Sequence, residues 1–435
     1  MHVCRRWRQI VFASPRRLNI QLLCTNGTPV RKNLACWPAF PIVVHYNTFE
    51  DLSHKDEGNV IAALKHRSRI RQIKLTVSSS VWSRIATVML EPFPALTSLS
   101  VCSWPRDVPL LLPVKFLGGS APSLQKIRLQ GFPTITLPYV ITHTSDLIKL
   151  DLIECNTHLT SCLSPAGLVV CLASLPRLKN LSITLPSFWT RTSNPDRWKD
   201  SLPANTRIVL PALTSFAFNG ACTYLEDLMT KIDTPGLDSL DIKFWDSRDY
   251  RIPQLSDFIN RTALKPFRFD DAKLSFVGGD MATIDLKDGL DLPPLSIEIP
   301  LCRGRNHQVW CLAQVLRQTS ATLSNVFRLE IVAESCDEED GDMRNVDWSK
   351  LLCPFTAVQT LHVYADSEFV ENIARALEDT LAEPDNKVLP ALNLLYVEGV
   401  GVTAESIVLP GRNCTITVRC QEPDSEASDL DLEDD

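Results

Sequence analysis

Glycine is scarce in this chain, and the signatures of the common nucleotide-binding and hydrolytic folds are missing. Only 16 of the 435 residues are glycine, and neither GxGxxG nor a P-loop sequence occurs, so nothing indicates a phosphate-binding turn. The nucleophile elbow GxSxG, the zinc-protease motif HExxH and the kinase signatures do not occur either. We therefore expect a protein that is not an enzyme and that uses no cofactor.

Long apolar runs and closely paired cysteines are missing as well. No stretch of about 20 apolar residues is present, which argues against a membrane-spanning helix. The fourteen cysteines form no CxxC pair, and the opening residues MHVCRRWRQI carry charge where a secretory signal is apolar. We expect an intracellular protein, cytoplasmic or nuclear, with buried reduced thiols rather than disulfides and with no membrane partner.

Charge of a single sign marks each end of the chain. Every charged side chain in residues 1–48 is basic, whereas residues 421–435 carry eight carboxylates and no basic group. Without those eight, the chain has 43 acidic and 44 basic residues, so the rest of it is nearly neutral. The net charge of −7 argues against nucleic acid as a partner, because phosphate binding needs a strongly basic face. Residues 421–435 are predicted to be a disordered acidic tail, because they can bury almost nothing.

One short phrase, Leu-x-x-Leu-x-Leu with other apolar residues allowed at the Leu places, recurs along the chain. Ten clear copies are 70–75, 96–101, 124–129, 147–152, 178–183, 213–218, 237–242, 326–331, 358–363 and 392–397, and two weaker ones are 264–269 and 292–297. Their middle apolar residues are 23 to 35 residues apart, at and above the ~20–29 typical of leucine-rich repeats. The alternative, a doubly wound α/β domain, predicts fewer copies and a glycine-rich phosphate turn.

The phrase ends in an apolar–polar alternation that predicts a short strand, and amphipathic stretches between the copies predict helices. The expected helices are 81–90, 168–175, 224–232, 255–261, 309–318 and 369–381. We predict an α/β fold, a right-handed leucine-rich-repeat solenoid or horseshoe with parallel strands on the concave face and helices on the convex face. The solenoid is predicted to hold about twelve repeats and to occupy residues 49–420. Six prolines precede the phrase and favour an extended lead-in: Pro94, Pro122, Pro176, Pro211, Pro235 and Pro390.

Residues 1–48 are predicted to form an N-terminal cap. A first helix places Val3, Trp7 and Ile10 on one face and its arginines on others. Ser14-Pro15 ends that helix, and residues 18–20 and 41–44 are the first expected strands.

Two segments of the head and one that leads into the first repeat, together with the repeats, resemble the F-box/leucine-rich-repeat proteins found in large numbers in mushroom-forming fungi. The segments are VCRRWRQIVFASPRRLNIQL, GTPVRKNLACWPAFPIVV and GNVIAALKHRSRIRQIKL. In that family the VCrrWr segment closes the F-box, which docks on the Skp adaptor of a cullin-RING ubiquitin ligase, and the repeats select the protein substrate. The resemblance implies that this chain is the substrate-recognition subunit of an SCF-type E3 ubiquitin ligase. It also implies that Val3, Trp7 and Ile10 are the remnant of the adaptor-facing surface.

The chain departs from that family at its head. An F-box begins with a Leu-Pro helix well before VCrrWr, so residues 1–48 hold only part of the module. The expectation is therefore either a receptor of this kind, or a truncated copy of one, or a leucine-rich-repeat binding scaffold with no ubiquitin role. In the last case the head serves as a cap over the apolar end of the repeats.

Two cysteine–histidine triplets have the composition of a metal site. Cys302, His307 and Cys311 lack the fourth ligand and the tight first spacing of zinc sites. We instead expect Cys311 to be buried with Trp310 and Leu312, and His307 to lie on a loop. The second triplet is interpreted in the same way: Cys155, His158 and Cys162. No metal is expected.

Two further segments remain candidates for partner binding. The acidic run 337–342 does not fit the EF-hand template and is predicted to be a solvated loop. Phe188, Trp189 and Trp198 fit either a binding hot spot or the packing of a long connection.

The binding surface is expected on the concave strand face, at the polar places inside the phrase. The residues predicted there are Ser100, Arg128, Asp151, Ser182, Asp241, Glu330 and His362. Their chemistry is mixed, so the sequence indicates a protein partner but does not identify it.

Overall fold

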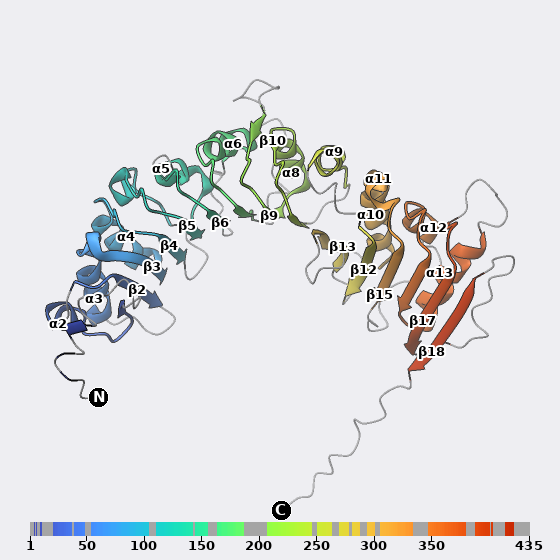
Figure 1. Cartoon of the computed structure of the whole chain (residues 1–435), viewed down its shortest axis with the longest axis horizontal. Coiled ribbons are helices and arrows are strands. Elements are labelled where there is room, and N and C mark those ends of the chain that lie inside the picture. Colours follow the sequence, from blue (N-terminus) through green and yellow to red (C-terminus); the bar gives the residue numbers. More distant parts are fainter. Residues whose placement is uncertain are drawn as a thin grey trace, which may run out of the picture. The chain divides into compact units, whose positions relative to one another are not determined.

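The structure is a computed structural model. It describes residues 4, 6, 9–10, 21–36, 39–47, 54–103, 110–141, 144–154, 163–186, 207–245, 250–262, 269–277, 281–287, 294–300, 305–333, 347–379, 388–400, 402 and 414–421. The chain divides into two compact units, unit 1 (residues 1–237) and unit 2 (residues 238–435). In each unit, helices lie along one face of a sheet (Figure 1). No helix among the described residues has the length and hydropathy to cross a membrane.

Unit 1 is built from parallel strands that lie side by side in chain order. The strands are β1 (Leu22–Cys24), β2 (Ile42–Asn47), β3 (Ile70–Val77), β4 (Ser98–Ser103), β5 (Lys126–Gln130), β6 (Lys149–Ile153), β7 (Asn180–Thr184) and β9 (Ser215–Gly220). A separate parallel pair joins β8 (Ile208–Val209) to β10 (Ile232–Asp233). The helices are α2 (Val30–Cys36), α3 (His54–Leu64), η1 (Arg67–Arg69), α4 (Ser79–Val88), η2 (Phe116–Gly119), η3 (Thr134–Thr136), α5 (Pro138–Ile141), α6 (Pro165–Ala173) and α8 (Cys222–Met229).

Each proline-led phrase starts with a tight turn. The amide of Leu96 donates a hydrogen bond to the carbonyl of Phe93 (3.2 Å), with Pro94 at the second place of the turn, where its fixed φ fits. The first leucine of the other five proline-led phrases makes the same bond to the residue three places before it, at 3.1 to 3.3 Å. The prolines therefore favour the turn that precedes each of these strands.

The core of unit 1 is a column of apolar residues from successive strands. Ile73, Leu99, Ile127, Leu150 and Leu181 are each at most 1% exposed, and the strand register places each directly opposite the next. Burying a side chain of this size contributes about 1.5–3 kcal/mol. The stacked repeats thus form a continuous core that one repeat alone could not make.

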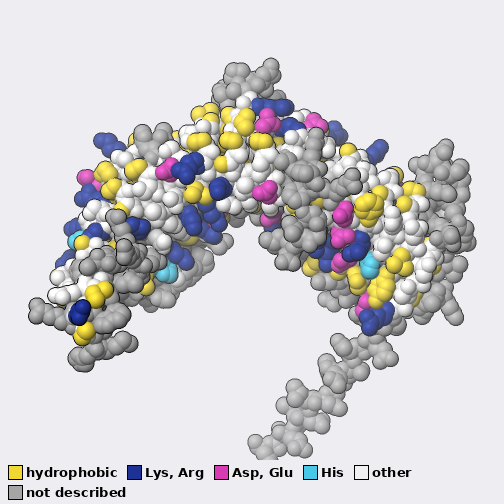
Figure 2. Space-filling view, in the orientation of Figure 1, with side chains coloured by type: hydrophobic (Ala, Val, Ile, Leu, Met, Phe, Trp, Pro, Cys, Tyr) yellow, Lys and Arg dark blue, Asp and Glu magenta, His cyan; other side chains and the backbone are white. Residues whose placement is uncertain are grey.

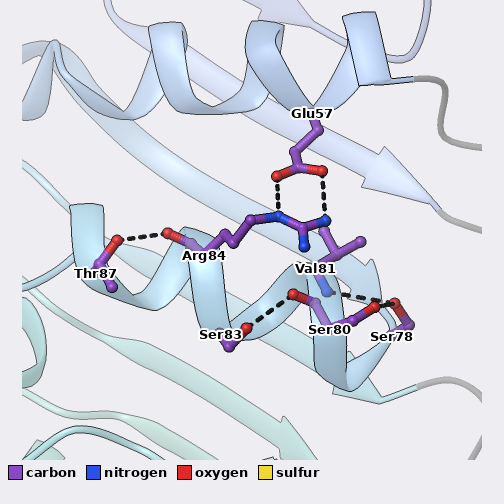
Figure 3. Close-up of polar contacts among 7 residues, drawn as sticks. All are labelled: Glu57, Ser78, Ser80, Val81, Ser83, Arg84 and Thr87. Atoms are coloured by element: carbon purple, nitrogen blue, oxygen red, sulfur yellow. Dashed lines mark hydrogen bonds and ion pairs between the residues drawn. The ribbon is translucent and has the colours of Figure 1, made fainter.

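Polar contacts join neighbouring repeats in the helical layer of unit 1. Arg84 of α4 reaches Glu57 of α3 with two parallel bonds, one from Nε to Oε1 and one from Nη2 to Oε2 (2.7 Å) (Figure 3). Such a bidentate pair fixes orientation as well as distance. The Ser78 hydroxyl accepts a bond from the Val81 amide (3.4 Å) and caps the start of α4. Helices α3 and α4 are therefore held in a fixed relation.

Unit 2 does not keep the chain order of its strands. Its sheet order is β11, β14, β13, β12, β15, β16, β17, β18. These strands are β11 (Ser239–Phe244), β12 (Asp271–Val277), β13 (Met281–Lys287), β14 (Leu295–Pro300), β15 (Arg328–Ala333), β16 (Thr360–Tyr364), β17 (Leu394–Val400) and β18 (Thr415–Gln421). The helices are α9 (Pro253–Arg261), α10 (Arg305–Gln318), α11 (Ser320–Leu323), α12 (Trp348–Leu352) and α13 (Ser367–Asp379).

The prediction of parallel strands throughout was wrong for unit 2. Strand β13 is antiparallel to both β12 and β14, while β14 is parallel to β11 and β12 is parallel to β15. The reason is connection length: three residues, 278–280, link β12 to β13, and seven, 288–294, link β13 to β14. A parallel connection needs about a dozen residues or more, so these strands must reverse direction.

Eleven of the twelve phrases coincide with strands. The exception is 264–269, of which only Phe269 is described, and the strand of that region begins later, at Asp271. Strands β1, β2, β8, β10, β12, β13 and β18 carry no phrase. The expected strand 41–44 is the start of β2, whereas 18–20 lies outside the described residues.

The six expected helices are present as α4, α6, α8, α9, α10 and α13. Helix α8 ends at Met229, so the expected extension to Ile232 was wrong, because Ile232 pairs in β10 instead. The architecture is a mixed α/β stack of strand–helix repeats in which parallel pairing predominates. The right-handed sense of its connections stays a prediction.

Candidate binding surface

The sheet face opposite the helices carries the polar residues of the repeat phrase. In β4, Leu99 and Val101 are buried, whereas Ser98, Ser100 and Cys102 are partly exposed. Strands β3, β5, β7 and β9 show the same alternation, because successive side chains of a strand point to opposite faces. We call this polar side the open face of each unit.

Four of the predicted binding residues lie side by side on the open face of unit 1. The register places Ser100, Arg128, Asp151 and Ser182 opposite one another on β4 to β7, and Lys74 of β3 continues the row. Arg128 Nη1 lies 3.1 Å from Asp151 Oδ2. Asp151 is only 8% exposed, whereas half of the Arg128 side chain is exposed. The row thus presents its cation to solvent and keeps the paired carboxylate buried.

A second row on the same face is basic, and the sequence reasoning missed it. Lys126 of β5 stands directly opposite Lys149 of β6, and both are exposed. Gln72, Ser98 and Asn180 continue the row on either side. The sequence did contain a signal for this row, because each of these residues directly precedes the middle apolar residue of its phrase.

The other predicted residues, Asp241, Glu330 and His362, share one row of unit 2. Glu330 of β15 is directly opposite His362 of β16. The antiparallel strands separate Asp241 of β11 from Glu330. The residues between them in the row are Ser296, Asp285 and Lys273. The shared row was predicted, but the order of its members was not.

Three cations on the open face of unit 2 are paired with carboxylates of neighbouring strands. The pairs are Lys243 with Glu298, Lys273 with Glu330 at 2.8 Å, and Arg328 with Asp271 at 3.6 Å. Each joins two strands across the sheet. Within these three pairs the charges are locally balanced.

Asp241 lies beside one of these pairs and has a perturbed pKa. Its partial burial raises the pKa of the carboxyl above the usual Asp value, and the negative charges of Glu298 and Asp285 raise it further. Lys243 opposes the shift but does not cancel it. Asp241 is therefore a carboxylate held in an environment that disfavours its charge.

Three rings form an aromatic cluster on the open face of unit 2. His362 lies 5.2 Å from Tyr396 and 6.4 Å from Tyr364 between ring centroids, and the two tyrosines are 6.3 Å apart. All three side chains are partly exposed. Tyr396 donates a hydrogen bond to Glu398 Oε2 (3.2 Å). Partial burial raises the pKa of Tyr364, with nearby Glu330 and Glu398 adding to the effect, so this phenol stays neutral at physiological pH.

The head residues are described only in part. Ile10 is in helical conformation and 53% exposed. Val3 and Trp7 lie outside the described residues, and so does most of the expected first helix.

The expected surroundings of Cys311 were partly wrong. Cys311 and Leu312 are fully buried, but Trp310 is 46% exposed, because the three lie on consecutive positions of α10 and cannot share one face. His307 also belongs to α10 rather than to a loop. Cys302 lies outside the described residues, among which no cluster of potential metal ligands occurs.

Three other candidates fall outside the described residues altogether: the triplet Cys155, His158 and Cys162, the acidic run 337–342, and the aromatic residues Phe188, Trp189 and Trp198. The same holds for nearly all of the tail, 422–435.

The cysteines are less uniformly buried than expected. Cys24 and Cys171 are buried, and burial raises the pKa of the Cys171 thiol to about 11. Cys36 and Cys353 are exposed. Both stand at the C-terminal end of a short helix, Cys36 in α2 and Cys353 after α12.

The chain matches no protein-family model and no curated protein. Among solved structures it is similar to the leucine-rich repeat-containing protein LegL7 from Legionella pneumophila. The two are 14% identical with a TM-score of 0.30, and the similarity covers 75% of this chain and 91% of that one. A similarity of this size carries no argument about function. The repeat architecture rests on the phrase and on the strand register described above.

Proposed function

We propose that this chain is a non-catalytic, intracellular scaffold that binds another protein on its open faces. The observation that carries the proposal is the aromatic cluster of His362, Tyr364 and Tyr396. Tyrosine combines a large apolar ring with a polar tip, and partly exposed aromatic groups of this kind are enriched among the residues that dominate binding energy. Here they stand on a strand face among charged residues that would form the polar rim of an interface.

Affinity purification of the full chain with quantitative mass spectrometry tests the proposal. The test variant is Tyr364→Ala/Tyr396→Ala, which removes two rings of the aromatic cluster. The matched control is Tyr139→Ala/Trp310→Ala, which removes two rings that are 40% and 46% exposed on helices α5 and α10. We expect the test variant to lose the proteins that the unchanged chain captures, since removal of a hot-spot residue costs about 2 kcal/mol or more. Equal loss in both variants, or none in either, would contradict the proposal.

We further propose that the scaffold is the substrate-recognition subunit of an SCF-type ubiquitin ligase, or a truncated copy of one. The support is the resemblance of the head to F-box/leucine-rich-repeat proteins, together with the exposure of Ile10. In this reading Val3, Trp7 and Ile10 contact a Skp-type adaptor, and the open faces hold the protein substrate.

Binding to the adaptor separates this role from a scaffold with no ubiquitin role. The full chain should co-purify with a Skp-type adaptor, and Val3→Ala/Trp7→Ala/Ile10→Ala should abolish that binding while leaving capture by the open faces intact. Partner proteins should also persist longer in cells that lack the chain. Failure of adaptor binding together with unchanged partner lifetimes would leave only the scaffold.

A further inference from the structure

We infer that the open face of unit 1 binds an acidic, carboxylate-rich segment of a protein partner through a cation patch made of Lys74, Lys126, Arg128 and Lys149. This inference rests on the proposed scaffold function and specifies the chemistry of what unit 1 holds. Figure 2 shows Lys and Arg side chains gathered over the part of unit 1 that contains β5 and β6.

The register concentrates the patch. Lys126 and Lys149 are directly opposite each other, and Lys74 and Arg128 lie in the next row of the same face, two strands apart. Neighbouring strands are about 4.8 Å apart, so the patch from β3 to β6 spans about 14 Å. That length corresponds to about four residues of an extended peptide. A short run of Asp or Glu therefore matches the patch in size.

The cations of the patch are poorly compensated. Lys74, Lys126 and Lys149 are exposed, and among the described residues none of the three forms an ion pair. Arg128 is paired with Asp151 but keeps half of its side chain exposed. Among the open-face residues that the structure describes here, the four cations thus have one carboxylate partner. Like charges directly opposite each other in a sheet are destabilising, so this arrangement costs folding free energy that an acidic partner would recover.

Unit 2 differs from unit 1 in that three of its open-face cations are paired. On its open face Lys243, Lys273 and Arg328 each have a carboxylate partner on an adjacent strand. An incoming acidic segment would have to break those pairs. The cation patch offers its charges without that cost.

The surroundings of the patch favour a peptide over a nucleic acid. Single-stranded nucleic acid is held largely by aromatic side chains that stack on bases, and His45 is the one ring on the open-face positions of β2 to β9. Affinity for duplex DNA comes mainly from many cations that neutralise phosphates, whereas the patch holds four cations.

Fluorescence anisotropy on the full chain tests the inference, with a labelled peptide of eight glutamates as the probe. The test variant is Lys126→Glu/Lys149→Glu. The control, Lys65→Glu/Lys115→Glu, changes the net charge equally at two exposed residues away from the open face. We expect the test variant to weaken binding about tenfold, because two attractive contacts become repulsive, and the control to change it less than about twofold. Lys126→Gln/Lys149→Gln should give an intermediate loss, and it guards against misfolding caused by charge reversal.

Two results would overturn the inference. One is equal weakening by the test and control variants, which would reduce the effect to net charge. The other is tighter binding of an eight-residue thymidine oligonucleotide than of the octaglutamate peptide, which would assign the patch to nucleic acid. Tyr364→Ala/Tyr396→Ala should bind the peptide as the unchanged chain does. If that variant loses the captured partners and the unchanged chain does not bind the peptide, the two proposals separate. The proposed function would then stand, and the role of the cation patch would be refuted.

Discussion

The two units apply the same repeat in different ways. In unit 1 every strand of the sheet follows its predecessor in chain order and in the same direction. In unit 2 the chain passes from β11 to β12, returns through the antiparallel β13, and only with β14 pairs beside β11. The phrase with its tight turn therefore produces parallel stacking only where the connection is long enough to hold a helix. Shorter connections reverse the chain and change the order of the strands.

The same difference appears in the charges of the open faces. Unit 1 places Lys126 opposite Lys149, whereas unit 2 places cations opposite carboxylates, as with Lys273 and Glu330. Cross-strand pairs of opposite charge stabilise a sheet and like pairs weaken it. In unit 2 these ion pairs therefore stabilise the contacts between the mixed strands. In unit 1 the cations of the patch remain available to a ligand.

The largest expected effect comes from placing a carboxylate in the middle of the antiparallel strands. Ile284 of β13 is 3% exposed and stands between Leu274 and Ile297. Ile284→Asp should destabilise unit 2 by ~4 kcal/mol or more, because it buries an unpaired charge. Hydrogen exchange measured by mass spectrometry should show protection lost in residues 238–421 and kept in unit 1.

The matched change in unit 1 is Ile127→Asp, at a residue 1% exposed on β5. It should produce the reverse pattern, with protection lost in unit 1 and kept in unit 2. If either substitution speeds exchange equally in both units, the chain unfolds as one cooperative body, and the comparison of two units does not extend to stability.

The next largest effect concerns a glycine that occurs at the same position of the repeat in both units but is packed more tightly in unit 2. Gly220 and Gly399 each lie two residues after the last apolar residue of a phrase. A Cβ on Gly399 would lie 1.7 Å from the carbonyl oxygen of Ala365, a backbone atom, whereas on Gly220 it would meet the end of the Phe218 ring at 2.8 Å. Gly399→Ala should therefore cost about 2–3 kcal/mol and Gly220→Ala about 1 kcal/mol, as measured by chemical denaturation.

Gly58 is the control for that pair. It lies within α3, and nothing stands within 4 Å of its would-be Cβ. Gly58→Ala should stabilise the chain by about 0.5–1 kcal/mol, because alanine favours the helix. Equal costs at Gly220 and Gly399 would show that β16 and β17 approach no more closely than the strands of unit 1.

Among the described residues, each unit has one buried tryptophan, and the two differ in the hydrogen bonding of the indole N–H. Trp82 of unit 1 donates to the carbonyl of Leu111 (2.9 Å), whereas Nε1 of Trp348 is buried and makes no bond to any described residue. Both rings pack against phenylalanines. Trp82→Phe should therefore cost about 1–2 kcal/mol more than Trp348→Phe, since only the first loses a hydrogen bond and the second removes an unsatisfied donor. Thermal unfolding of the two variants compares them, and equal losses would contradict this assignment.

Much of the fold could be predicted from the phrase. It marks eleven strands, and the proline before it marks the turn, because both depend on residues close together in the chain. The antiparallel strands had a readable signal too. Ala272, Leu274 and Phe276 alternate with polar residues, and Gly278-Gly279 follows them, which is typical of a hairpin. The search for the repeat phrase alone did not use this two-residue alternation. It predicted a repeat at 264–269 instead.

The sequence could predict which residues lie on the open face, but not which of them are neighbours there. The phrase places Arg128 and Asp151 on one face, but their pairing, like the opposition of Lys126 and Lys149, depends on which strands are adjacent and in what register. The aromatic cluster was partly visible in the sequence, because His362 and Tyr396 occupy the same polar place of successive phrases, whereas Tyr364 follows its phrase directly. Contacts between residues about 30 apart in the chain become definite only when the strands are placed.

The smallest expected effect concerns two aspartates at the same place in the phrase. Asp241 of unit 2 has a pKa raised chiefly by burial, with Glu298 and Asp285 adding to it. Because its pKa is higher in the folded chain than in the unfolded one, the folded state binds the proton more tightly. The wild type therefore loses stability as the pH rises from the usual Asp value through the raised one. Asp241→Asn, which cannot ionise, should be more stable than the wild type at pH 7, and the two should converge in acid.

Asp151→Asn in unit 1 should have the opposite sign at pH 7. Asp151 is ion-paired with Arg128 at 3.1 Å, so its removal should cost about 1 kcal/mol or less, as for other partly exposed pairs. Chemical denaturation of both variants between pH 3 and pH 8 measures the two curves. If Asp241→Asn also destabilises at neutral pH, the attraction of Lys243 outweighs burial and the neighbouring carboxylates. The open face of unit 2 would then be as favourable a place for that charge as the face of unit 1 is for Asp151.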